Sequence, residues 1–159
     1  MTRSFFLAAA ALLVGATSAL PQTMSYGTSI TAETAKKLAA PAIAEARTNQ
    51  WTMAVAIVDT AGELVYFERM DDTQVGSVDV AISKARSAAR FKRPTKAFQD
   101  ALAAGGEGLR ILALQGAVPV DGGVPLVMGG KIVGAIGASG GTSAQDGQVA
   151  AAGAAALGK

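Results

Sequence analysis

The chain has 159 residues, of which 50% are hydrophobic and 16% are charged, and its mean hydropathy is +0.34. This balance excludes a disordered chain, because disorder requires low hydrophobicity and high net charge. The sequence contains neither cysteine nor histidine, which excludes disulfides, thiol nucleophiles, Ser-His-Asp triads and histidine-ligated metal sites. The length predicts one domain with its own core, and a net charge of +2 is too small to indicate a nucleic-acid partner.

The first 19 residues have the pattern of a secretory signal peptide. Arg3 supplies a positive charge, an apolar run follows, and residues 16–19 are mostly small. The run from Phe5 to Gly15 has 11 residues, whereas a membrane span needs about 20. We therefore expect residues 1–19 to be a signal peptide and residues 20–159 to be the mature domain. The expected location is periplasmic or secreted, with no stable membrane anchor.

The mature chain begins with a predicted helix and hairpin. Residues 31–50 have apolar positions at helical spacing, with Thr31 as the expected cap and Pro41 as an expected kink or early end. Residues 53–58 are short, apolar and partly β-branched, which favours a buried strand. Turn residues then lead to a second strand at 63–69.

The rest of the chain predicts two or three helices, a second hairpin and a last helix. Gly129 and Gly130 favour a two-residue hairpin turn, because both turn positions can require positive φ. Gly134 and Gly137, inside a strand, indicate close approach by a helix or a neighbouring subunit. The expected fold class is α+β, a single domain whose largely antiparallel central sheet is flanked by helices. The expected elements are helices at 75–91, 96–104 and 142–157, strands at 124–128 and 131–138, and an ambiguous segment at 107–115.

Basic residues gather in the middle of the chain. Six of the 14 fall within 13 positions, with no acidic residue among them. They form either a solvated helix end or a site for carboxylates, haem propionates or phosphates. Nucleic acid is disfavoured because few aromatic residues interleave with them. The six are Lys84, Arg86, Arg90, Lys92, Arg93 and Lys96, and Lys84 is expected to be partly buried.

Two further segments could bind a ligand. Residues 134–142 are glycine-rich and lead from a strand into a helix, so their N–H groups could attract an anion, or could form only a tight turn. Thr142 and Gln145 predict a capping box there. Residues 68–72 place two aspartates at a strand end, which favours turn chemistry over acid–base chemistry. Met70 beside them is a soft ligand or core filler.

Several motifs together resemble the GlcG/HbpS family of haem-binding and haem-degrading-like proteins, which includes the C-terminal domain of PduO. They are VD-x-x-G, R-MD, S-x-x-x-A-x-x-KA, PT, GG-V-P and G-x-IG-x-SGGT-x-x-QD, spread over residues 32–157. The resemblance implies an α+β domain of profilin-like build that self-associates to dimers or octamers. Several members of the family bind haem.

The family motifs suggest the site residues. Candidate ligand-binding residues are Lys84, Arg90, Thr95, Met70, Asp71, Gly140, Gly141 and Thr142. Histidine, an expected axial ligand of haem iron, is missing. If haem binds, the iron must be held by Thr95, Met70, Tyr66, Lys84 or water, or at a subunit interface.

Three functions follow from these features. The first is an exported, oligomeric haem- or tetrapyrrole-binding protein. The second is an enzyme acting on a small carboxylate or carbonyl metabolite, in which Lys84 works with Asp59 or Asp146 as catalytic groups. The third is an accessory or assembly protein without ligand chemistry. The alanine-rich last helix needs another helix or sheet to cover its small faces, within the chain or in another subunit.

Overall fold

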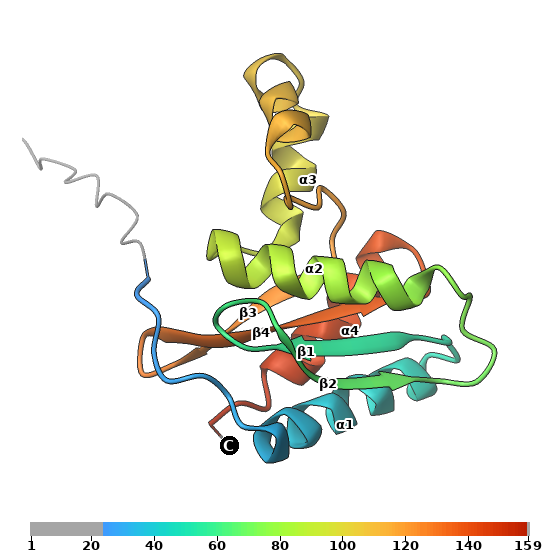
Figure 1. Ribbon diagram of the computed structural model, residues 1–159. Coiled ribbons are helices and arrows are strands. Elements are labelled where there is room, and N and C mark those ends of the chain that lie inside the picture. The colour runs from blue at the N-terminus through green and yellow to red at the C-terminus, as the bar shows by residue number, and fades with distance from the viewer. Residues whose placement is uncertain (1–23, 159) are drawn as a thin grey trace, which may run out of the picture.

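The computed structural model describes residues 24–158, and the predicted signal peptide lies outside this range. Four strands form one antiparallel sheet in the order β2-β1-β4-β3, with helices on both faces (Figure 1). This confirms the α+β class and the predicted order of elements. The elements are α1 (Ala32–Thr48), β1 (Ala54–Val58), β2 (Leu64–Arg69), α2 (Ser77–Phe91), α3 (Thr95–Ala103), the 3₁₀ helix η1 (Gly106–Ala113), β3 (Gly123–Met128), β4 (Lys131–Ser139) and α4 (Ser143–Ala154).

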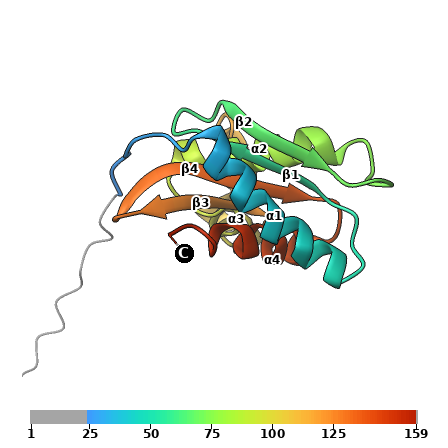
Figure 2. The ribbon, with the colours of Figure 1, turned by 90° about the horizontal axis from the view of Figure 1, so that it is seen from below.

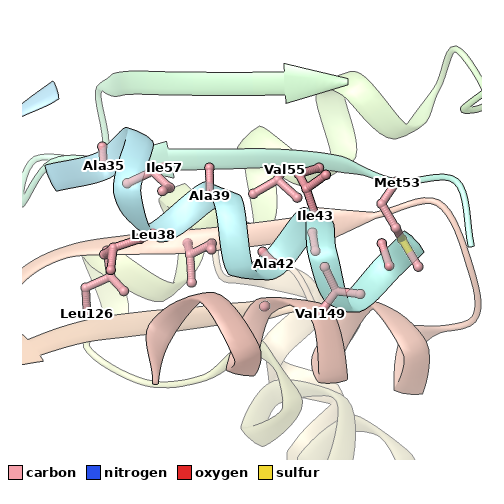
Figure 3. Close-up of a cluster of buried hydrophobic side chains, with 14 of the residues drawn as sticks. Ala35, Leu38, Ala39, Ala42, Ile43, Met53, Val55, Ile57, Leu126 and Val149 are labelled. Atoms are coloured by element: carbon pink, nitrogen blue, oxygen red, sulfur yellow. The ribbon is translucent and has the colours of Figure 1, made fainter. Parts of the chain in front are cut away.

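Helices α1 and α4 cover one face of the sheet (Figure 2). Alternate residues of the strands point to this side, and Figure 3 shows how Val55 and Ile57 of β1 meet Leu38 and Ile43 of α1 in the larger of two cores. Ala150 of α4 belongs to the same core. The alanine-rich last helix therefore buries one of its small faces within the chain.

Helix α2 covers the opposite face with small side chains on both sides of the contact. Its alanines pack on alanines of β1 and β4. Gly137 faces it so closely that a Cβ there would meet the carbonyl oxygen of Ala81 and lie 3.0 Å from the Cβ of Ala85. The close approach predicted from Gly137 is thus made by a helix of the same chain.

Local signals place the element ends close to the expected positions. Thr31 caps α1 by accepting a hydrogen bond from Thr34 N, and Thr142 forms the predicted capping box with Gln145. Gly129 and Gly130 have φ of 55° and 73°, as the hairpin turn requires.

Three features differ from the expectations or go beyond them. Helix α1 continues through Pro41 to Thr48, because packing on both sides of the proline holds it. The ambiguous segment forms η1, in which no residue is buried. Residues 25–30 run beside β4, with Gly27 N and Ile30 N donating to Ile132 O and Val133 O. Among the described helices, none has the length and apolar character needed to cross a membrane.

Candidate functional site

A buried ion pair joins α2 to α4. Lys84 Nζ donates to Asp146 Oδ2 at 2.6 Å and to the carbonyl oxygen of Ala138 at 3.2 Å. Lys84 is 0% exposed and Asp146 is 3% exposed. Charged groups this deeply buried are found paired because an isolated charge would be far too costly. Lys84 is therefore more deeply buried than the expected partial burial, and its partner is one of the two carboxylates named as candidates.

Glycines and a threonine enclose this pair. A Cβ on Gly122 would lie 2.9 Å from Lys84 Nζ and 2.8 Å from the Cβ of Asp146, so only glycine leaves room for the pair. The next residue, Gly123, donates its N–H to Thr95 Oγ1 at 2.9 Å, and Thr95 is fully buried. We call Lys84, Asp146, Thr95, Gly122 and Gly123 the buried node.

The glycine-rich joint between β4 and α4 closes the node from the other side. Gly141 N donates to Asp146 Oδ1 at 3.0 Å, and Thr142 N donates to Gln145 Oε1 at 2.8 Å. Gly140 packs against the backbone of Met53. The N–H groups of Gly141 and Thr142 are thus bonded to side chains of the chain itself and are not free to receive an outside anion.

The basic segment does not form one patch. Arg86 and Arg90 both reach Glu63, at 3.8 and 3.2 Å. Lys92 lies over the ring of Tyr26. Lys96 pairs with Asp100, and this hydrogen bond raises the pKa of its ammonium group. The side chains diverge because Lys84 points inward from α2 while the others reach different neighbours.

Asp59 and Arg90 lie together at the tip of the β1–β2 hairpin, apart from the node. Asp59 Oδ1 accepts the N–H groups of Ala61 and Glu63 at 2.8 Å each. Arg90 Nε donates to the carbonyl oxygen of Ala61 at 2.8 Å. Asp59 therefore makes the turn, and it does not share the site of Lys84.

Tyr66, Met70 and Asp71 form a third group along β2 and at its end. Tyr66 donates to Glu68 Oε2 at 3.1 Å, and burial together with this carboxylate raises the pKa of the phenol. Met70 is half-buried against the larger core, and Asp71 is exposed. Residues 63–70 lead from the hairpin tip to Met70 and span roughly 26 Å if extended. The contacts of Arg90 at the hairpin tip and Met70 therefore lie at opposite ends of β2.

Sequence reasoning missed several polar residues that belong near the node. Ser77 Oγ bonds to Ser139 Oγ at 3.2 Å, and Ser87 Oγ accepts the N–H of Val118 at 3.0 Å. The available signal was that Ser77, Lys84 and Ser87 share a helix face with small apolar residues. In the sequence, Gly122 and Gly123 are identified only as the first two residues of the GG-V-P motif. Among residues 24–158, no group of three or more His, Cys, Asp or Glu side chains could hold a metal ion.

The fold and the node define the class of protein. An antiparallel sheet lies between α2 and the α1–α4 pair, and the KA, PT, GG-V-P and SGGT-x-x-QD motifs meet in one buried cluster. The chain belongs to the family described as haem degrading protein HbpS-like, whose sequence model matches residues 30–155. The resemblance predicted from the motifs is confirmed.

Named relatives agree with this assignment. Protein GlcG of Escherichia coli K12 is 37% identical over 95 residues, which cover 60% of this chain and 69% of GlcG. The crystal structure of a double mutant of HbpS from Streptomyces reticuli has a TM-score of 0.76 and 30% identity, covering 96% of this chain and all of that one. The crystal structure of a PduOC:heme complex has a TM-score of 0.74 and 30% identity, covering 82% of this chain and 96% of that one.

Proposed function

We propose that the protein binds haem as an assembly of several copies, and that it is exported. The observation that carries haem binding is the similarity, over most of both chains, to the PduOC:heme complex, in a family named for haem degradation. Export is supported by the signal-peptide pattern of residues 1–19. Neither nucleic acid nor a membrane anchor is part of the proposal.

The contacts that the candidate side chains already make narrow the choice of iron ligand. Lys84 is committed to Asp146, and Thr95 is fully buried with its oxygen accepting the Gly123 N–H. Tyr66 would have to ionise to bind iron strongly, and burial and Glu68 oppose ionisation by raising its pKa. Of the candidate side chains within one copy, Met70 remains, since no polar contact is found for its thioether among the described residues.

We therefore propose Met70 as the iron ligand, at the end of the edge strand β2. Methionine is a known axial ligand of haem iron. Arg69 is exposed and next in sequence, so it is available to a propionate, while Asp71 borders the site. Bound haem would supply a redox-active iron, and the chain's part is to hold and orient the ring. The buried node and the adjoining Gly140, Gly141 and Thr142 hold α2 and α4 in place around the sheet.

A haem titration followed in the Soret region tests the assignment. The unmodified protein should saturate, Met70→Leu should bind more weakly with a shifted Soret band, and Met128→Leu should match the unmodified protein. Met128 is the matched control because it is a half-exposed methionine on a different strand. Saturable binding that Met70→Leu leaves unchanged would refute the ligand, and no saturable binding by the unmodified protein would refute the function.

The enzyme alternative gains no support from the arrangement of Lys84. An amine that captures a carbonyl must be reachable by substrate, whereas Lys84 is enclosed by α2, Gly122 and Asp146. For this reason we propose that the ion pair between Lys84 and Asp146 holds α2 and α4 together and takes no part in a reaction.

A further inference from the structure

A neutral apolar arm projects from the domain. The arm comprises residues 95–120, that is α3, η1 and the segment that returns to β3, and Figure 1 shows it standing away from the sheet and from α1 and α4. Its base is anchored to the body, because Thr95 bonds to Gly123 and Gln99 Oε1 accepts the N–H of Asp121. Phe98 packs edge-to-face on Phe91 of α2 at the same place.

The far part of the arm has almost no core of its own. None of the eight residues of η1 is buried, and α3 buries only Thr95 and Phe98. A 3₁₀ helix of this length is unusual, and short isolated helices are marginal in water. Large apolar side chains nevertheless face solvent there, with Leu112 70% exposed and Leu109 55% exposed. Leu114 and Val120 are also exposed. Several large apolar side chains exposed on one segment are typical of an interaction site.

The charges of the arm indicate what covers it. The arm has two cations and two anions, and each cation pairs inside the arm, Lys96 with Asp100 at 2.7 Å and Arg110 with Glu107 at 3.1 Å. An anionic lipid surface or a nucleic acid requires an excess of cations, and the arm has none. Two neutral copies of one apolar surface, in contrast, can meet without charge repulsion and bury leucine against leucine.

We propose that the arm docks against a second copy of the chain, with Leu109 and Leu112 at the centre of the interface. This names the surface for the self-association included in the proposed function. The proposal does not depend on haem binding, because it rests only on the exposed side chains of the arm.

Sedimentation velocity of the haem-free protein over a range of concentrations tests the arm. Leu112→Lys should weaken association by about tenfold or more, because a charge is placed at the interface centre. Val75→Lys is the matched control, since Val75 is 80% exposed but lies on the body before α2, and it should associate like the unmodified protein. Far-ultraviolet circular dichroism checks that each variant is folded, and Leu109→Lys replaces Leu112→Lys if the latter is not.

Two results would overturn the proposal. One is a monomeric unmodified protein at the highest concentration reached. The other is a folded Leu112→Lys that associates as tightly as the unmodified protein. If folded Leu112→Lys associates as tightly as the unmodified protein but no longer binds phosphatidylcholine vesicles, the arm binds lipid instead. Haem titration of the same samples keeps the two proposals separate, because haem binding could fail while arm-dependent association persists.

Discussion

Replacing Lys84 by methionine removes one half of the buried ion pair while keeping most of the side-chain volume. Asp146 then keeps the Gly141 N–H but loses the ammonium group 2.6 Å from its Oδ2. Removing one partner of a buried pair costs about 3–5 kcal/mol of the free energy of unfolding. This is a large part of the roughly 5–15 kcal/mol available to a domain. At about 2–4 °C for each kcal/mol, the melting temperature should fall by about 6–20 °C.

Urea denaturation of four proteins provides the assay: the unmodified chain, Lys84→Met, Asp146→Leu and the double variant. The double variant should lose less than the sum of the single losses, with a coupling of about 1 kcal/mol or more, because neither charge is left unpaired. Lys131→Met, at an exposed lysine, should stay within about 0.5 kcal/mol of the unmodified chain. A Lys84→Met variant that is as stable as this control, or strictly additive losses, would refute a structural ion pair.

Three more predictions concern packing, turn geometry and ionisation. Gly137→Val should destabilise the domain by about 1–3 kcal/mol in urea, because its side chain would collide with α2 at Ala81; an unchanged midpoint would contradict this contact. Gly130→Ala should cost about 1 kcal/mol in the same assay, since φ is 73° there, and no loss would argue against the turn. Tyr66 should ionise above its ordinary pKa of 10.0 in an ultraviolet titration of a Tyr26→Phe background, and Glu68→Gln should bring the pKa closer to that value. Because the folded-state pKa is raised, the phenol's contribution to stability is present below pH 10 and is lost as the pH rises through the folded-state pKa.

Local patterns predicted the elements well because each carries its own signal. The apolar run of β1, the glycine pair at 129–130 and the Thr142 capping box all act within a few residues. The segment that became η1 stayed ambiguous, because its leucines do not face a core. Residues 25–30 contact β4 only through an isolated bridge at Tyr26 and a few backbone hydrogen bonds, a pairing too short to give an alternating strand pattern.

The candidate site was only partly predictable because it is made by contacts between distant segments. Lys84 was expected to be partly buried from its place on an apolar helix face, but Asp146 is 62 residues further along. Sequence spacing cannot identify such a partner. The basic segment was compatible with one anion site or with a solvated helix end, because its members are neighbours in sequence. In the fold Arg86 and Arg90 reach Glu63, and Lys84 turns inward.

Haem titration in the presence of albumin as a competitor tests whether the protein binds haem. We expect a saturable Soret spectrum at one haem per chain that persists when albumin is added. Transfer of all the haem to albumin, with no saturable component left on the protein, would contradict it.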